Sequence, residues 1–288
     1  MNLNDFRYMR RGAHLSALKP KDATLLEAID LRNEKKQYAL LLLHGFSSSP
    51  AVFRHVLTSF SDYDAIIAPV LPGHAMSIDV FANMKTSELL AHVEKICASL
   101  VLEYQHVDVM GLSLGGILAA HLAQRFKLNH LYLLAPAFDL HLATGKMIKL
   151  AKCLERLGFY RLRNQAGNIY ASNEGELTYQ QLPLTSIIEL LHFIEHFELK
   201  DPSCPTDLFL GKYDEVVASE LVAARFANSN NTSIHWLDNS AHVLPLDGDI
   251  ETIIHCVMSN LQQNKTPEFK PKTPNPNKNA DVAPLPLS

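Results

Sequence analysis

The sequence predicts an α/β fold in which a mainly parallel central sheet is flanked by helices and a small helical cap is inserted between late strands. Short apolar runs typical of buried strands alternate with longer segments whose apolar residues recur at helical spacing. Strands that alternate with helices form parallel sheets covered on both faces. The alternation stops between residues 138 and 202, where helical patterns continue without a convincing strand.

The first half of the chain supplies most of the expected sheet. Two strands joined by a polar turn are expected first, and a helix is expected to open at Ser49-Pro50, because serine can cap a helix and proline fits its first position. Strands are expected at 24–31, 38–44, 65–70, 106–112 and 131–135, and the following helices at 87–104 and 115–127.

The second half begins with the cap, at about residues 138–200. Strands are expected again at 206–211 and 233–237, followed by a final amphipathic helix over 249–262. An insertion at this point predicts a lid over the carboxyl-terminal edge of the sheet, where open α/β sheets bind ligands.

Length and composition indicate one large domain and a tail. We expect residues 1–263 to form the domain and residues 264–288, rich in Pro, Asn and Lys, to be disordered, because this tail has too few apolar residues to offset its ordering entropy. The four cysteines are widely spaced and form no C-x-x-C pair, which argues against a zinc or redox motif.

Charge and hydropathy exclude several classes of partner. The net charge is −4, from 26 basic and 30 acidic side chains, so nothing indicates an electrostatic grip on nucleic acid or an anionic membrane. The start of the chain lacks the apolar core of a secretory signal, and the densest early apolar run, Ala39 to Leu43, is too short for a transmembrane segment. The expected location is cytoplasmic, and the oligomeric state stays open.

The segment Gly111-Leu112-Ser113-Leu114-Gly115 contains the candidate nucleophile. A G-x-S-x-G turn lets the chain pass sharply from strand to helix and holds the serine at the tip. The motif alone is weak, but here a plausible buried strand precedes it and a helical pattern follows it. A serine hydroxyl also needs a neighbouring base to take its proton. We therefore predict Ser113 as the nucleophile.

A second loop, which begins at His44-Gly45-Phe46 after an apolar strand, supplies a candidate oxyanion hole. A tetrahedral oxyanion needs two N–H donors fixed before the reaction. The backbone N–H of Leu114, next to the nucleophile, is one natural donor, and the N–H of Phe46 is the second. His44 precedes the nucleophile on the wrong loop for a base, so we expect it to bond within this loop.

The acid and the base are expected on loops after two late strands. A buried carboxylate at Asp214 could orient an imidazole, with Glu215 as the fallback; Asp207 and Asp201 lie inside or before the strand. His242 is the predicted base, because His235 lies in a strand and His255 in the last helix. The order Ser113, Asp214, His242 matches that of the G-x-S-x-G architecture.

The 14 histidines do not indicate a metal site. His192 and His196 are four residues apart beside Glu189 and Glu195, but no further ligand set is evident, and a solvated helix face explains them. We expect no metal and no cofactor-binding residue.

Together these segments resemble the bacterial carboxylesterases and monoacylglycerol lipases of the α/β-hydrolase superfamily. The resemblance covers roughly residues 38–261 and rests on the motifs around Phe46, Ser113, Asp214 and His242. It implies a Ser-His-Asp triad, an oxyanion hole from the two N–H groups, a small helical cap and no cofactor. The chain departs from the family's pattern at Ala75 and Ala241, where glycine is common, and its first 37 residues lie outside it.

The resemblance implies a serine hydrolase that cleaves small-molecule carboxylic esters, either short-to-medium acyl esters or monoacylglycerols, through an acyl-enzyme. The cap residues rich in Leu and Ile are expected to line an acyl pocket. Thioesterase, lysophospholipase and carbon–carbon bond hydrolase activities on the same triad remain open. A binding protein that has lost catalysis is the alternative from another class.

Overall fold

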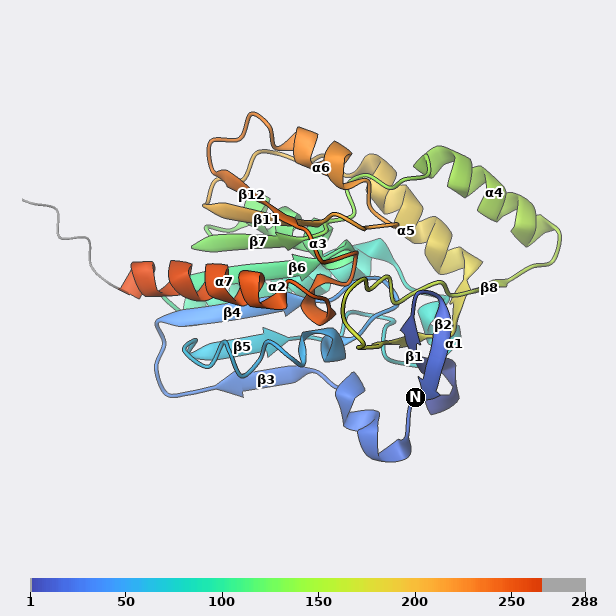
Figure 1. The fold of residues 1–288 in the computed structure, drawn as a ribbon, viewed down its shortest axis with the longest axis horizontal. Helices are drawn as coiled ribbons and strands as arrows, with labels where there is room; N and C mark the ends of the chain where they lie inside the picture. The colour runs from blue at the N-terminus through green and yellow to red at the C-terminus, as the bar shows by residue number, and fades with distance from the viewer. Residues whose placement is uncertain (1, 266–288) are drawn as a thin grey trace, which may run out of the picture.

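A computed structural model describes residues 2–265 of the chain and shows a seven-stranded central sheet. Its strands are β3 (Ile29–Arg32), β4 (Tyr38–Leu43), β5 (Ala65–Ala68), β6 (His106–Leu112), β7 (His130–Leu134), β11 (Thr206–Gly211) and β12 (Thr232–Leu237). They lie in the order β12-β11-β7-β6-β4-β5-β3, and every neighbouring pair is parallel except β3 with β5 (Figure 1). The fold is the predicted α/β architecture with a mainly parallel sheet.

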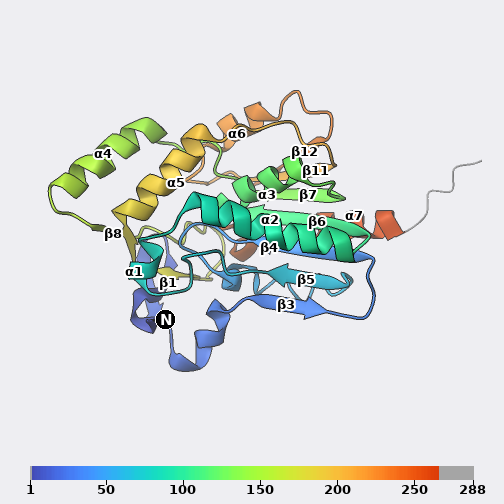
Figure 2. The same cartoon turned by 180° about the vertical axis from the view of Figure 1, so that it is seen from behind.

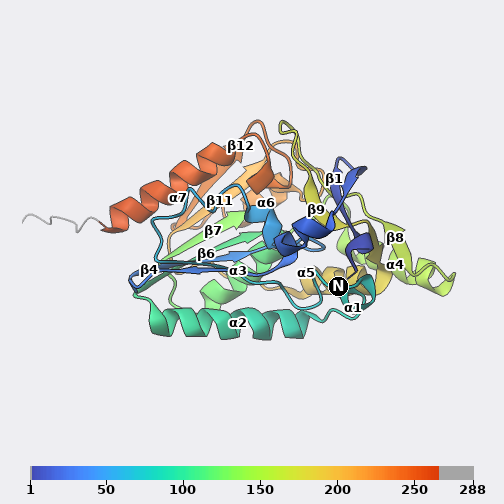
Figure 3. The same cartoon turned by 90° about the horizontal axis from the view of Figure 1, so that it is seen from below.

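Helices cover both faces of the sheet. Figure 3 shows α7 (Ile250–Lys265) on one side of the sheet and α2 (Thr86–Glu103) on the other, with α3 (Leu114–Arg125) beside α2 in the reverse view of Figure 2. All six residues of β4 are buried: Leu41 and Leu43 belong to the core that includes α2 and α3, and Leu40 and Leu42 to the core that includes α7. A strand buried on both faces reads as a continuous apolar run, which is why β4 was recognisable in the sequence.

The cap lies beyond one end of the sheet. Helices α4 (Thr144–Arg156) and α5 (Leu184–His196) pack side by side there, as Figures 1 and 3 show. The remaining helical turns are α1 (Ile78–Phe81), α6 (Ser219–Arg225) and the 3₁₀ turns η1 (Leu3–Asp5), η2 (Pro20–Leu26), η3 (Pro50–Phe53) and η4 (Leu244–Leu246). The inserted segment thus sits where the sequence predicts a lid.

The cap contains strands that the sequence pattern does not reveal. They are β8 (Arg161–Arg163), β9 (Glu176–Tyr179) and β10 (Gln181–Pro183). β8 pairs with β10, and β9 pairs with β1 (Phe6–Arg10), which in turn pairs with β2 (Ala13–Ala17). The expectation of a purely helical insertion was wrong, because strands of three or four residues are too short to show a period and the partner of β9 lies about 170 residues away.

The start of the chain also differs from the expectation. Residues 24–26 belong to η2, and β3 begins only at Ile29 and pairs with β5 instead of β4. The helix expected at Ser49-Pro50 is a 3₁₀ turn, in which Val52 N–H bonds to Ser49 O and Arg54 N–H to Ala51 O, three residues apart, and the Ser49 side chain makes no cap. This tighter winding packs Val52 and Phe53 into the core beside α7.

The predicted tail, residues 264–288, overlaps the described part of the chain at its first two residues. Residues 264 and 265 still belong to α7, and the expectation of disorder over 266–288 lies outside the described residues. Between residues 2 and 265, no helix is both long and apolar enough to cross a membrane.

Candidate active site

Ser113 occupies a strained turn between β6 and α3. Its φ is +55°, a left-handed conformation that side chains other than glycine seldom adopt. The turn is held by hydrogen bonds from Ser113 N–H to Leu134 O at 3.0 Å and from Gly116 N–H to Ser113 O at 2.9 Å. A β-carbon on Gly115 would overlap the backbone of Leu43, so only glycine lets α3 start this close to β4.

The predicted oxyanion loop lies directly against the serine. A β-carbon built on Gly45 would be 3.4 Å from Ser113 Cβ, and the next residue is Phe46. Among the described residues, the backbone N–H groups of Phe46 and Leu114 have no hydrogen-bond acceptor. Unpaired N–H groups at a helix N-terminus and in a neighbouring loop are suited to receive a developing negative charge.

Asp214 lies in the loop after β11 with its side chain fully buried. Its Oδ1 accepts hydrogen bonds from Val216 N–H and Val217 N–H, both at 2.8 Å. Its Oδ2 lies 2.8 Å from Nδ1 of His242, which lies in the loop after β12. Glu215, the fallback acid, is exposed. The structure therefore brings Asp214, and not Glu215, to His242.

The surroundings of His242 act on its pKa in opposite directions. Burial lowers its pKa, but the charge of Asp214, the hydrogen bond that His242 donates to Asp214 and the charge of Glu176 together raise the pKa above the ordinary value. Within the described part of the chain, Ser113 and His242 are not joined by a hydrogen bond. Such bonds are often long in the absence of substrate.

Glu176, on β9, is a buried acid that sequence reasoning missed. Burial raises its pKa, partly offset by a hydrogen bond from Gly167 N–H and by the charge of His242. It stands in a short strand far from every recognised motif, so no spacing signal could have found it. Like that of Asp214, its charge raises the pKa of His242.

Asn168 and Asp247 were also missed, and both organise the loops. Asn168 Oδ1 accepts hydrogen bonds from Glu215 N–H at 3.0 Å and His242 N–H at 3.2 Å. Asp247 is buried and accepts from Ala241 N–H at 2.8 Å and from three successive N–H groups of the cap. In the sequence, only the position of Asp247, five residues after His242, points to a role near the base.

His44 bonds within its own loop. Its Nδ1 donates to Gly45 O at 2.9 Å, and its Nε2 accepts from Leu71 N–H at 3.1 Å. Burial and the neighbouring His74 lower its pKa to about 3, so it stays neutral. These contacts agree with the structural role expected from its position.

Comparisons with known proteins place the chain in a family. A family model described as "Alpha/beta hydrolase family" matches residues 40–252, well over half of the chain. The chain belongs to the alpha/beta hydrolase family. It is 25% identical over 230 residues to a thermostable monoacylglycerol lipase from Bacillus sp. (strain H-257), a match that covers 77% of this chain and 89% of that protein.

Solved structures share the hydrolase fold. One, from work on the metagenome-derived lipolytic enzymes LipS and LipT, has a TM-score of 0.74 at 22% identity and covers 83% of this chain and 98% of its own. Another, a soluble variant of monoglyceride lipase from Saccharomyces cerevisiae, has a TM-score of 0.66 at 14% identity and covers 84% and 92%. With the family match, these relatives support a lipase-like hydrolase.

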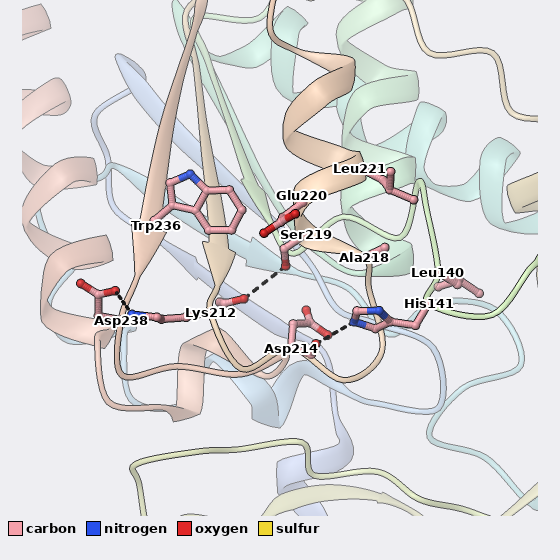
Figure 4. A pocket seen from close by; sticks show the side chains of 11 residues that line it. Leu140, His141, Lys212, Asp214, Ala218, Ser219, Glu220, Leu221, Trp236 and Asp238 are labelled. Atoms are coloured by element: carbon pink, nitrogen blue, oxygen red, sulfur yellow. Dashed lines mark hydrogen bonds and ion pairs between the residues drawn. The ribbon is translucent and has the colours of Figure 1, made fainter.

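One cavity of this alpha/beta hydrolase lies beside the loop that carries Asp214. It has a volume of about 610 Å³, and Figure 4 shows Trp236, Glu220 and His141 around it, with Asp214 on its wall. Neither Ser113 nor His242 lines it. His141 Nε2 lies 2.8 Å from Asp214 O, so this wall also braces the acid loop.

Two groups of possible metal donors occur in the described part of the hydrolase. His192, Glu195 and His196 lie on the solvent-facing surface of α5, where Lys152 Nζ is 3.2 Å from His192 Nε2. The other group surrounds Asp207, whose two carboxylate oxygens accept from His130 and His235 at 2.7 and 2.6 Å. The first group lies beside a lysine ammonium, which repels a cation. In the second group, both carboxylate oxygens already accept hydrogen bonds, so neither group favours a metal ion.

Proposed function

We propose that this protein is a serine hydrolase that cleaves carboxylic esters by a Ser-His-Asp triad of Ser113, His242 and Asp214. The observation that carries the proposal is the combination of Ser113 at a strained strand-to-helix turn with the 2.8 Å contact between His242 Nδ1 and Asp214 Oδ2. Ser113 follows β6, Asp214 follows β11 and His242 comes after β12, so all three residues come after parallel strands of one sheet, which is the arrangement that acyl transfer on this fold uses.

In the first half-reaction, Ser113 Oγ attacks the ester carbonyl carbon while His242 Nε2 takes the hydroxyl proton. The carbonyl oxygen becomes an oxyanion, to which the N–H groups of Phe46 and Leu114 donate. Asp214 stabilises the imidazolium and keeps Nδ1 as the donor. Collapse of the tetrahedral intermediate then breaks the bond to the alcohol oxygen, which leaves with the proton from His242.

In the second half-reaction, a water molecule attacks the acyl-enzyme. His242 accepts its proton, the new oxyanion occupies the same two donors, and collapse releases the carboxylic acid and returns the proton to Ser113 Oγ. The base works only when neutral, so activity should fall as the pH drops through the raised pKa of His242.

Short-to-medium acyl esters and monoacylglycerols are the proposed substrates. The monoacylglycerol lipase relative supports this choice, and so do the buried apolar side chains of α5, a helix of the cap, such as Leu191 and Ile194. An acyl pocket lined by the cap is part of the proposal.

A substrate panel separates this proposal from its alternatives. We expect the wild type to hydrolyse p-nitrophenyl esters and monoacylglycerol faster than acyl-CoA thioesters or lysophospholipids, and Ser113→Ala to lower kcat by on the order of 10⁴-fold or more. If the wild type prefers a thioester or a lysophospholipid, the proposed triad still holds but the proposed substrate class is wrong. Hydrolysis that is equal in wild type and Ser113→Ala would contradict the triad itself.

A further inference from the structure

The N-terminal hairpin of β1 and β2 lies outside the stretch that matches the family model, yet it contacts the segment next to the proposed base. The tip of the hairpin is Arg11-Gly12, both in the left-handed region. Arg11 N–H donates to Gly167 O at 2.6 Å, and Gly12 N–H donates to Ala166 O at 3.0 Å. The hairpin tip is therefore bonded to the chain just before Asn168.

The Arg11 side chain extends these contacts along the same segment. Its Nε donates to Ile169 O at 3.1 Å, and its Nη2 donates to Tyr170 O at 2.7 Å. The guanidinium carbon also lies 5.8 Å from the centre of the Tyr170 ring. Charged donors make the stronger kind of hydrogen bond, and a planar guanidinium fixes direction as well as distance. Arg11 thus holds both carbonyls that follow Asn168.

Asn168 passes this restraint to the base loop and the acid loop together. Its carbonyl oxygen accepts from His242 N–H at 3.0 Å and Val243 N–H at 3.1 Å. Its side-chain Oδ1 accepts from His242 N–H at 3.2 Å and Glu215 N–H at 3.0 Å. A single residue, itself buried, therefore spans the loops that present His242 and Asp214.

A second connection runs through two tyrosine rings. Tyr170 stacks on Tyr213, the residue before Asp214, with ring centres 3.6 Å apart and planes 11° from parallel. The N–H of Tyr170 also donates to the buried Asp247 at 2.7 Å, and the same carboxylate oxygen accepts from Ala241 N–H. The segment between Arg11 and the two loops is therefore restrained on both sides.

We propose that the N-terminal hairpin positions the general base and the acid of the active site, with Arg11 and Asn168 as its positioning residues. The proposal rests on the assignment of His242 and Asp214 to the triad. It gives a role to the part of the chain that precedes the family match. A displacement of about 1 Å at a reacting group costs up to 10²-fold in rate, so restraint of the two loops has a direct effect on turnover.

The first test compares kinetics of folded variants on a p-nitrophenyl ester. Arg11→Ala and Asn168→Ala should each lower kcat on the order of tenfold with little change in KM. The double variant should lose no more than the more damaging single variant, because both residues act through one connection. Asn168→Asp, which keeps an accepting oxygen, should recover most of the loss, whereas Arg11→Lys keeps a cationic donor but not the planar fork and should recover only part of it. Arg7→Ala is the matched control, because the Arg7 side chain donates to the carbonyls of Asn4 and Phe6 in its own strand region.

The pH profile supplies a readout that a general loss of packing would not move. Asp214 and Glu176 are the charged groups that raise the pKa of His242. If the loops move apart, the influence of Asp214 weakens, and the acid limb of kcat/KM should shift to lower pH in Arg11→Ala and Asn168→Ala. Asn168→Asp places another carboxylate beside His242, so its acid limb should shift to higher pH.

The outcomes distinguish this inference from the proposed function. If the wild type is inactive, or if its activity does not depend on Ser113, the triad assignment fails first. If the wild type shows Ser113-dependent turnover and the folded Arg11→Ala and Asn168→Ala proteins match Arg7→Ala in kcat and pH profile, the positioning role of the hairpin is overturned.

Discussion

At the scale of single residues, the pKa of His242 is raised by the charges of two carboxylates, Asp214 and Glu176, that come from distant parts of the chain. Asp214 could be predicted, because it follows a late strand at the position where the architecture needs an acid. Glu176 could not, because its proximity to His242 arises from the pairing of β9 with β1. Both charges favour the imidazolium, which a base forms when it takes the proton of the nucleophile.

Replacing Glu176 by Gln should shift the pH dependence of catalysis. Loss of this charge lowers the pKa of His242, so the imidazole stays neutral to lower pH and the acid limb of kcat/KM moves in the same direction. A pH series of initial rates measures the shift. Glu174→Gln, a change of equal size on a more exposed side chain that pairs with Arg54, should leave the limb in place. An unmoved limb in Glu176→Gln would refute the electrostatic role.

At the scale of elements, β9 supports the loop that presents the N–H of Phe46. Thr178 Oγ1 donates to Ser47 O at 2.8 Å, and its oxygen lies 3.0 Å from Ser47 Oγ. Ser47 itself has a φ of +60°, so the loop is held in a conformation that needs support from its neighbours. β9, a strand of the cap, thus supports the loop of the proposed oxyanion hole.

Thr178→Val should therefore reduce both stability and turnover. The change keeps the shape of the side chain but leaves the buried Ser47 carbonyl without this donor, at a cost of about 1–3 kcal/mol in the free energy of unfolding. We also expect a lower kcat, since the loop that presents Phe46 loses a restraint. Urea titration and steady-state kinetics measure the two effects. Thr185→Val, which removes an exposed bond to Ala82 O, is the control, and equal behaviour of the two variants would contradict this role of β9.

The elements that the sequence predicts well are those with a long, regular pattern. β6, β11 and α2 have their expected bounds within one residue, because full burial or a helical stripe marks them. The short strands β8, β9 and β10 have no such mark, since three or four residues do not define a period and each pairs with a partner chosen by tertiary contacts. The residues proposed for the site divide in the same way. The loops that follow the long strands can be identified from the sequence, whereas the residues of the cap and hairpin that support these loops cannot.

At the scale of the whole molecule, two buried histidines make stability depend on pH. Burial lowers the pKa of His74 to about 4, and its ring packs edge-on against His44, 5.2 Å away between centres. In the unfolded chain His74 has an ordinary pKa near 6.5. The unfolded state therefore binds a proton that the native state does not, and His74 makes the folded state less stable as the pH falls below about 6.5.

His74→Phe should flatten this dependence. The phenyl ring keeps the aromatic contacts with Phe81 but does not titrate, so the loss of unfolding free energy between pH 7.5 and pH 5 should be smaller than in the wild type. Urea unfolding at the two pH values makes the comparison, and the exposed His14→Phe serves as the control. A loss in His74→Phe as large as that in the wild type would show that His74 binds protons equally in the folded and unfolded states.

The central claim is that Ser113 is the nucleophile of a serine hydrolase, and covalent labelling tests it most directly. A fluorophosphonate probe forms a stable bond to an activated serine, and intact-protein mass spectrometry with peptide mapping locates the adduct. We predict one adduct per folded chain, on the peptide that contains Ser113, with labelling lost in Ser113→Ala and greatly slowed in His242→Ala. A folded wild type that stays unlabelled, or an adduct on any other residue, would contradict the claim.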